Sequence, residues 1–127
     1  MNSNAISLSA EMEDYLEAIA SLFRNHGTAR VTDIAKRLVV SKSSVTLALR
    51  TLADKGLVHY QPYMTPTLTE NGRKIAERVQ HRHDILKQFL VNILGVDAAL
   101  AEKNACRMEH VISDESFEKI KALSLKQ

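Results

Sequence analysis

The single cysteine of the chain, Cys106, is followed at helical spacing by Glu109 and then directly by His110. On a helix these three side chains share one face, because they are three and four positions apart. A thiolate, a carboxylate and an imidazole can all bind first-row divalent metal ions. The triplet alone leaves a second interpretation open, since unpaired cysteines are commonly buried as small apolar residues and a histidine near a helix end is often structural.

Two further groups of polar residues favour the metal site. Asp14 and Glu17 are spaced by three positions, on a face of an expected helix that its apolar stripe leaves free. Their alternative role is a solvated acidic face. A long expected helix carries a further histidine at the margin of its apolar stripe, near where a following antiparallel helix would pack. Six side chains could then converge: Asp14, Glu17, His83, Cys106, Glu109 and His110.

This set mixes oxygen, nitrogen and sulfur donors, which suits a first-row divalent ion better than Mg²⁺ or Ca²⁺. Sulfur favours Fe²⁺, Co²⁺ or Zn²⁺, whereas the carboxylates favour Mn²⁺. His81, two positions before His83, is expected at a solvated edge, outside the set.

The elements that must position these residues are mostly helices. Gly and Pro total six residues, aromatic residues make up 5% and hydrophobic residues 45% of the chain, a composition typical of a packed, mainly helical protein. Apolar residues recur at helical spacing in several segments. Helix starts are expected at Ser9, Thr32, Ser41, Thr69, Asp97 and Ser113 or Asp114. Helix ends are expected at Gly27, Gly56 and Gly95, the last after a long helix from Thr69 to about Leu94.

Two of the expected helices are short and joined by a tight turn at Val39-Val40, which predicts a helix-turn-helix. Residues 57–63 and 65–68 read as two strands of a hairpin, with its tip at Met64-Thr65. Such a hairpin would form a wing. Pro62 and Pro66 indicate that its strands are edge strands and not part of a central sheet. We expect a mainly α protein: a winged helix-turn-helix DNA-binding domain (1–70), followed by a helical metal-binding and dimerisation domain (71–127).

The second helix of the pair would expose a small, polar face. Hydroxyls and Lys42 could reach base edges, Leu47 a thymine methyl group, and Arg50 and Lys55 the phosphates. The helix start also directs backbone N–H groups outward. The predicted DNA-binding residues are Arg30, Ser41, Lys42, Ser43, Ser44, Thr46, Leu47, Arg50 and Lys55. A helix-turn-helix that contacts protein instead is the alternative.

Charge is unevenly distributed along the chain, although the net charge is only +2. Residues 28–62 contain six Lys or Arg against two acids, whereas residues 11–17 contain four acids and no base. The basic segment adds modest support for nucleic-acid binding. We expect no signal peptide, no membrane span and no internal disulfide, and hence a cytoplasmic location.

From about Ser9 onward the chain resembles the DtxR/MntR family of metal-dependent transcriptional repressors. The matching segments are MEDYLEAI (12–19), VTDIAKRLVVSKSSVTLALRTLADKGLV (31–58), LTENGRKIA (68–76), RHDILKQFLVNILGV (82–96) and ACRMEHVISDE (105–115). The resemblance implies a homodimer that binds a palindromic operator in double-stranded DNA. Its corepressor would be Mn²⁺ or Fe²⁺, with Co²⁺ or Zn²⁺ as possible substitutes.

The resemblance also implies roles for particular residues. Family metal-ligand positions match Asp14, His83, Cys106, Glu109 and His110, and Glu17 matches in manganese-type members. Family positions that approach DNA match Ser41, Ser43, Ser44 and Thr46.

The chain departs from the family pattern at four places. Cys106 is iron-type, whereas Asp14 and Glu17 are manganese-type, so the site is a hybrid. Lys87 replaces an acidic ligand of a second site, which leaves His83 and Glu102 as a possible weak second site. The wing tip lacks the usual Arg-Gly. The chain ends at Gln127, so we expect a short form without the SH3-like third domain of longer members.

Two other functions fit parts of the sequence. A metal-independent winged-helix regulator could sense a small molecule, or oxidation of the Cys106 thiol. A small metalloenzyme would need an open coordination position and a general base, and the sequence offers no acid–base pair beyond the proposed ligands.

Overall fold

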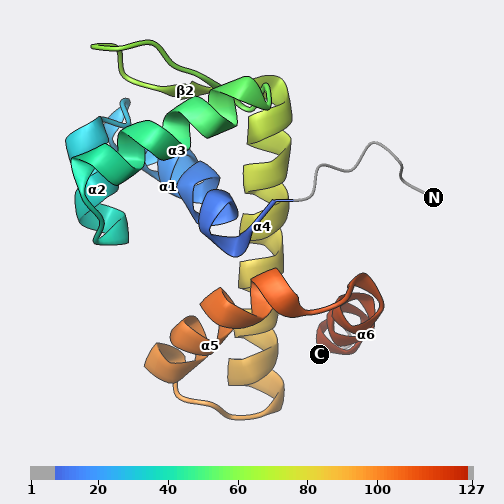
Figure 1. Cartoon of the computed structure of the whole chain (residues 1–127). Helices are drawn as coiled ribbons and strands as arrows, with labels where there is room; N and C mark the ends of the chain where they lie inside the picture. Colours follow the sequence, from blue (N-terminus) through green and yellow to red (C-terminus); the bar gives the residue numbers. More distant parts are fainter. Residues whose placement is uncertain (1–7, 126–127) are drawn as a thin grey trace. The chain divides into compact units, whose positions relative to one another are not determined.

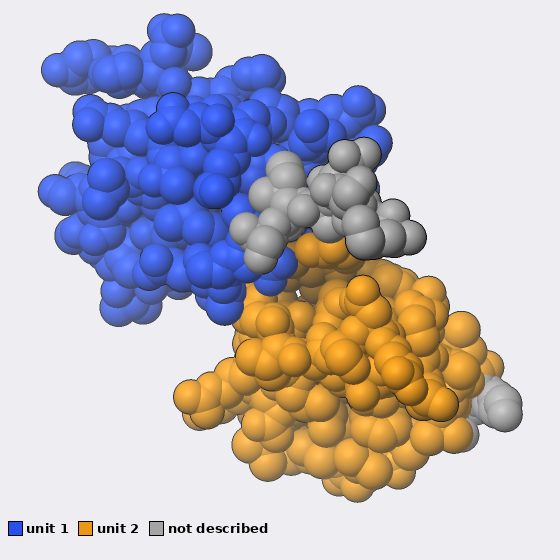
Figure 2. Space-filling model, turned by 45° about the vertical axis from the view of Figure 1, so that its right-hand side comes forward, with its two compact units in different colours: residues 1–77 blue, residues 78–127 orange. Residues whose placement is uncertain are grey.

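The computed structural model describes residues 8–125, and these are mainly helical, as the sequence predicts (Figure 1). The chain forms two compact units, unit 1 (residues 1–77) and unit 2 (residues 78–127) (Figure 2). The division falls inside helix α4 (Glu70–Gln88), so this helix contributes residues to both units. The domain boundary expected after residue 70 stays a prediction. Within residues 8–125, no helix is both long enough and apolar enough to cross a membrane.

Unit 1 contains helices α1 (Ala10–His26), α2 (Val31–Leu38) and α3 (Lys42–Asp54), a two-stranded sheet and the start of α4. Ser9 caps α1 by accepting a hydrogen bond from the Met12 backbone N–H at 3.2 Å, and Gly27 ends it in a left-handed conformation with φ 79°. Both ends are as predicted, because side-chain capping and glycine's freedom at positive φ are local properties.

The core of unit 1 is formed by side chains that the helical spacing predicts to face inward. Leu16, Val45, Leu49 and Leu52 are fully buried. The helices α1, α2 and α3 pack on one another around them (Figure 1). The whole buried cluster is Tyr15, Leu16, Ile19, Leu22, Ala29, Ile34, Ala35, Val45, Ala48, Leu49, Leu52, Leu57, Val58 and Ala76.

The turn between α2 and α3 lies at Val39-Val40, as expected. Val39 adopts a left-handed conformation (φ 57°, ψ 52°), which is unusual for a β-branched residue, and its side chain is 88% exposed. Val40 packs against the core instead. The predicted start of α2 at Thr32 is wrong: the helix begins at Val31 after Arg30, whose side chain makes no capping hydrogen bond.

The wing is shorter than predicted. Only β1 (Val58–His59) and β2 (Thr67–Leu68) pair, antiparallel, with Val58 opposite Leu68 and His59 opposite Thr67. The predicted strands over 57–63 and 65–68 are therefore wrong in extent. The loop between β1 and β2 contains Pro62 and Pro66, which lack the N–H groups a ladder needs. It also contains Tyr63 at φ 69°, which no strand accommodates.

Gly72, in the first turn of α4, is required by a close backbone approach. A Cβ atom there would lie 2.0 Å from the Leu57 carbonyl oxygen. Thr69 fastens the same turn to the end of α3, because its hydroxyl donates to the Gly56 carbonyl at 2.7 Å and accepts from the Gly72 N–H at 3.1 Å. The start of α4 is thus fixed against the segment that leads into the wing.

Unit 2 contains the rest of α4, a π-helix η1 (Phe89–Ile93), α5 (Ala98–Val111) and α6 (Asp114–Ser124). The predicted α-helix from Thr69 to about Leu94 is therefore wrong in its last turns. There the Leu94 N–H donates to the Phe89 carbonyl, five residues back, at 3.2 Å. Asp97 and Ser113 cap α5 and α6 as predicted, accepting from Leu100 N–H at 3.3 Å and Ser116 N–H at 3.1 Å.

The apolar core of unit 2 is small. It consists of Ile85, Leu86, Leu90, Ala101, Ala105 and Phe117. Arg82 lies beside it, with its guanidinium carbon 5.0 Å from the centre of the Phe117 ring and one nitrogen 2.9 Å from Asp114. A second guanidinium nitrogen donates to the Ile112 carbonyl. Arg82 thereby ties α4 to the junction between α5 and α6.

Candidate metal centre and nucleic-acid interface

His83 occupies the centre of a polar cluster inside unit 2. It lies on α4, and its side chain is only 8% exposed. Its Nδ1 is 2.7 Å from Glu109 Oε1, and its Nε2 is 2.9 Å from Glu102 Oε2. Both ring nitrogens therefore face carboxylates of α5. We call the set of His83, Glu102, Cys106, Glu109 and His110 the His83 cluster.

The helical spacing of α5 brings the remaining members of the cluster to His83. Glu102 and Cys106 are four positions apart, and Cys106 Sγ lies 3.7 Å from both Glu102 Oε2 and His83 Nδ1. The Cys106 thiol is exposed. Lys87, one turn after His83, places its Nζ 3.1 Å from the second Glu102 oxygen, Oε1. Glu102 is therefore shared between an imidazole and an ammonium group.

Glu109 and His110 lie deeper in unit 2 than Cys106. The Glu109 side chain is 2% exposed and that of His110 is 7% exposed. His110 Nε2 lies 3.8 Å from Glu109 Oε2. A buried carboxylate is unfavourable unless it is paired, and here an imidazole lies near each of its two oxygens.

The carboxylates around His83 change its titration. The hydrogen bond with Glu109 raises the pKa of His83 to about 9, against the opposing effect of burial, and Glu102 adds to the rise. Burial would raise the pKa of Glu102, but the hydrogen bonds from His83 and Lys87 outweigh burial and lower it. At neutral pH His83 is therefore cationic, and its two ring nitrogens face the Glu102 and Glu109 side chains.

The donor set fits a first-row divalent ion. The nearest donor atoms of His83, Glu102 and Cys106 all lie within 4.8 Å of one another. Two ligands of a common ion, each about 2.0–2.3 Å away from it, can be no more than about 4.6 Å apart, so small side-chain movements suffice. Among residues 8–125 this is the group of His, Cys, Asp and Glu side chains that meets this distance requirement.

Four of the six predicted metal ligands are thus close together in unit 2: His83, Cys106, Glu109 and His110. Glu102, predicted for a second site only, lies 2.9 Å from His83, closer than Cys106 at 3.7 Å. Asp14 and Glu17 lie on α1 in unit 1, where both are half-buried. Their convergence with the unit 2 ligands stays a prediction. His81 is exposed, as expected, with its ring centre 6.0 Å from that of Phe117.

The predicted DNA-binding residues surround α3 and are mostly exposed. Val45, Leu49 and Leu52 face the core, which turns the opposite side of α3 outward. Leu47 is 66% exposed on this side. Thr46 is half-buried, and the remaining predicted residues are exposed: Arg30, Ser41, Lys42, Ser43, Ser44, Arg50 and Lys55.

Several of the hydroxyl groups on this face also hold the helix in place. Ser41 Oγ accepts from the Ser44 N–H at 3.0 Å and donates to Ser44 Oγ at 3.0 Å. Thr46 Oγ1 donates to the Lys42 carbonyl at 3.0 Å. Ser43 is also exposed and does not cap the helix, so its hydroxyl is the one most open to a base edge or phosphate.

Two residues outside the predicted DNA-binding set lie beside this face. Thr32 and Lys36, both on α2, line an open groove with Ser41 and Lys42 beside the start of α3. Lys36 could have been predicted as a DNA-binding residue from the excess of Lys and Arg in residues 28–62. The groove itself could not be foreseen, because it depends on how α2 and α3 pack.

Two protein families match the chain. The N-terminal DNA binding domain of iron dependent repressors matches residues 7–65. The metal binding and dimerisation domain of iron dependent repressors matches residues 69–125. Together they cover both the helix-turn-helix and the His83 cluster.

Individual relatives agree with these matches. The chain is 39% identical over 115 residues to an uncharacterized HTH-type transcriptional regulator of Methanocaldococcus jannaschii, which covers 90% of this chain and 92% of that protein. It is 37% identical to the transcriptional regulator MntR of Escherichia coli O6:H1, over 91% of this chain and 74% of that protein. A solved manganese-dependent transcriptional repressor in complex with manganese matches with a TM-score of 0.83 and 32% identity, over 91% of this chain. The chain spans about half, 53%, of that repressor's length.

Proposed function

Since this chain belongs to the DtxR/MntR family of metal-dependent transcriptional repressors, we propose that it represses transcription when a divalent ion, Mn²⁺ or Fe²⁺, binds the His83 cluster. The observation that carries this proposal is the placement of His83 between Glu102 and Glu109, with Cys106 Sγ 3.7 Å away. Imidazole, carboxylate and thiolate on one side of α5 form a ligand set for a transition metal.

Metal binding would replace positive charge that side chains of the cluster now supply. In the structure the positive charges among the carboxylates come from His83 and from Lys87. A bound divalent ion supplies two positive charges and requires a neutral imidazole and a thiolate. His83 and Cys106 would bind the ion as a neutral imidazole and a thiolate, and the Glu109 carboxylate lies within reach of both histidines.

Asp14 and Glu17 give the cluster its proposed connection to DNA binding. Both lie on α1, whose opposite face packs in the same core as α3. Brought together, the carboxylates of Asp14, Glu17 and Glu109 would repel one another unless they shared a cation. Sharing one would tie α1 to α5 and favour the conformation that binds DNA, which is a differential-affinity mechanism.

The thiol and the carboxylates of the proposed site prefer different metal ions. Cys106 favours Fe²⁺, Co²⁺ or Zn²⁺, whereas Asp14, Glu17 and Glu109 favour Mn²⁺. Lys87 pairs with Glu102 and brings a positive charge to the place where a second ion would need a negative ligand. We therefore propose one strongly held ion in each subunit.

The DNA-binding form is proposed to be a homodimer on a palindromic operator, in the cytoplasm. Unit 2 has a small core and exposes several large apolar side chains, which is typical of a surface that a second copy covers. These residues are Leu94, Leu100, Val111, Leu123 and Leu125. Two α3 helices related by a twofold axis would enter successive major grooves, roughly 34 Å apart.

The proposal is tested by operator binding, followed by fluorescence anisotropy under anaerobic conditions that keep Cys106 reduced. Mn²⁺ or Fe²⁺ should increase the affinity at least roughly tenfold, a coupling typical of allosteric effectors. Glu109→Gln should abolish this increase and retain the helical circular dichroism spectrum. Glu118→Gln, at an exposed position of α6, is the matched control. Equal affinity with and without metal would rule the proposal out.

Oxidation sensing through Cys106 is a second candidate, because this thiol is exposed. Cys106→Ser separates the two functions. The metal mechanism predicts weaker metal binding with Glu109 still required. The thiol mechanism predicts loss of a peroxide response, with no requirement for Glu109.

A further inference from the structure

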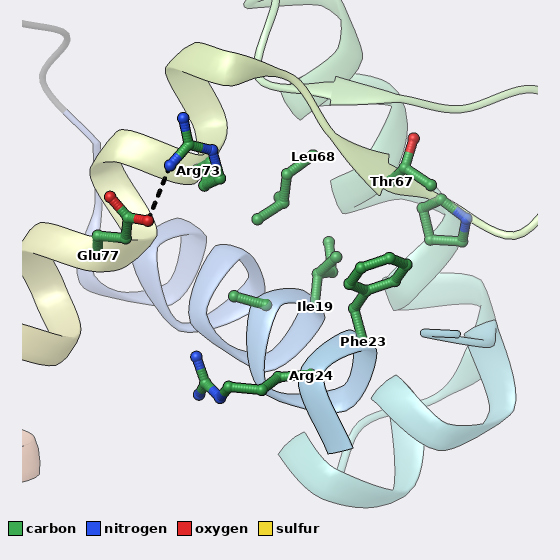
Figure 3. Close-up of a pocket in the computed structure, with 9 residues that line it drawn as sticks. Ile19, Phe23, Arg24, Thr67, Leu68, Arg73 and Glu77 are labelled. Atoms are coloured by element: carbon green, nitrogen blue, oxygen red, sulfur yellow. Dashed lines mark hydrogen bonds and ion pairs between the residues drawn. The ribbon is translucent and has the colours of Figure 1, made fainter. Parts of the chain in front are cut away.

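The ion pairs of α4 differ in what they connect. Near the start of the helix, Arg73 pairs with Glu70 at 4.0 Å and with Glu77 at 2.9 Å, both on α4 itself. These pairs lie beside a pocket at Phe23, between α1, β2 and α4 (Figure 3). All three charged side chains are more than half exposed, so the pairs contribute little. Near the end of the helix, a lysine pairs instead with α5, inside the His83 cluster.

This lysine, Lys87, shares the carboxylate of Glu102 with His83. Lys87 Nζ lies 3.1 Å from Glu102 Oε1, and His83 Nε2 lies 2.9 Å from Glu102 Oε2. The Lys87 side chain is 40% exposed and that of Glu102 is 48% exposed, so water screens this pair less than it screens the pairs of Arg73. Cys106 Sγ lies 3.7 Å from Oε2. One oxygen of Glu102 thus faces an ammonium group, and the other faces the donor atoms of His83 and Cys106.

The ammonium group lies where it opposes a metal ion. The donor atoms of His83, Glu102 and Cys106 all lie within 4.8 Å of one another, so these three side chains can hold one ion together. Such an ion and the Lys87 ammonium group would both bind the carboxylate of Glu102, and positive charges so close together repel each other. Lys87 also neutralises part of the negative charge that attracts the ion to Glu102.

We propose that Lys87 competes with the metal ion for Glu102 and thereby lowers the metal affinity of the His83 cluster. The protein then responds at a higher metal concentration than the same ligands would set without the lysine. This inference rests on the proposed function, because it concerns an ion bound to the same cluster. The test therefore measures metal binding directly and without DNA, so that the two proposals can fail separately.

The experiment is an anaerobic titration of the whole chain with Mn²⁺, in which electron paramagnetic resonance measures the free ion. Lys87→Met keeps a long side chain but removes its charge, and it should bind Mn²⁺ roughly tenfold more tightly because the repulsion is removed. Lys87→Arg keeps the charge and should leave the affinity nearly unchanged. Lys103→Met makes the same charge change at an exposed position of α5, and it should also have little effect because water and salt screen an exposed charge.

A second pair of variants determines whether Lys87 acts through Glu102. In a Glu102→Gln background, Lys87→Met should change Mn²⁺ affinity by about threefold or less, because the carboxylate for which lysine and ion compete is gone. A full tenfold gain in that background would overturn the competition. Unchanged or weaker Mn²⁺ binding by Lys87→Met alone would overturn the role of Lys87 and leave the proposed function intact. Failure of the unmodified protein to bind Mn²⁺ would overturn both proposals.

Discussion

The two units are stabilised in different ways. Unit 1 buries an entirely apolar cluster of 14 residues, whereas the described part of unit 2 has an apolar cluster of six and buries the charged side chains of His83 and Glu109 beside it. Apolar burial depends little on pH or on a bound ion, but buried charges depend on their partners. Unit 1, which contains the helix-turn-helix, is therefore stabilised mainly by apolar contacts, whereas unit 2 is the part whose stability we expect a bound ion to change.

The largest expected effect comes from removing apolar contacts in unit 1. Leu49→Ala should reduce the free energy of unfolding by about 2–5 kcal/mol, because it leaves a cavity at a fully buried position. Urea denaturation measures this loss. Added Mn²⁺ should not restore the lost free energy of unfolding. Leu47→Ala, at an exposed position of the same helix, should cost no more than about 0.5 kcal/mol. A loss of similar size in both variants would contradict the packing described for α3.

The next effect is stabilisation of unit 2 by metal. Mn²⁺ at about 100 times its Kd should stabilise the cluster by roughly 2.7 kcal/mol. Hydrogen exchange should show this as slower exchange in α5, with α3 nearly unchanged. If Asp14 and Glu17 are ligands, α1 should also exchange more slowly, and Asp14→Asn with Glu17→Gln should abolish the change in α1 alone. Unchanged exchange in α1 of the unmodified protein would remove these two residues from the ligand set.

A smaller effect should follow from pH in the absence of metal. The pKa of His83 is about 9 in the folded protein, above its ordinary value of 6.5. Its ion pairs therefore stabilise unit 2 fully below pH 6.5, and this contribution, on the order of 2 kcal/mol, is lost as the pH rises to about 9.

Urea denaturation at pH 6 and pH 9 measures this difference. Glu109→Gln should reduce the difference in stability between pH 6 and pH 9, because it removes the carboxylate that mainly raises the pKa of His83. Cys106→Ser serves as the control for thiol titration in the same range. A pH dependence that survives in Glu109→Gln would assign the effect to other groups. Metal affinity should change with pH in the opposite direction to stability and rise from pH 6 to pH 9, since binding displaces protons.

The smallest expected effect lies at the helix starts, which the two units share. Ser41→Ala in unit 1 and Ser113→Ala in unit 2 should each cost about 1 kcal/mol, because each serine accepts a backbone hydrogen bond. Thermal unfolding measures both losses. Only Ser41→Ala should also weaken operator binding, since its neighbours form the predicted DNA-binding face. Equal operator affinity in the two variants would contradict a role for the start of α3 in DNA binding.

Features that depend on neighbouring residues could be predicted from the sequence. The caps at Ser9, Ser41, Asp97 and Ser113 were of this kind, as were the buried positions Val45, Leu49 and Leu52. The four candidate ligands of unit 2 were also predictable in part, because Cys106, Glu109 and His110 share a helix face by spacing alone.

Features that depend on packing between elements could not be predicted. The short extent of the wing follows from two prolines and a left-handed Tyr63, and a strand pattern does not reveal such a conformation. The sharing of Glu102 between His83 and Lys87 requires α4 and α5 to be aligned. The pocket at Phe23 requires α1, β2 and α4 together, so no stretch of sequence signals it.

The π-helix η1 suggests where the length of the chain can vary. A hydrogen bond from Leu94 back to Phe89 encloses one more residue than an α-helical turn does. Removing a single exposed residue such as Asn92 would convert this turn to α-helical geometry and leave a continuous helix. We therefore expect one-residue deletions to be tolerated in η1, at a cost far below that of the same deletion between His83 and Lys87.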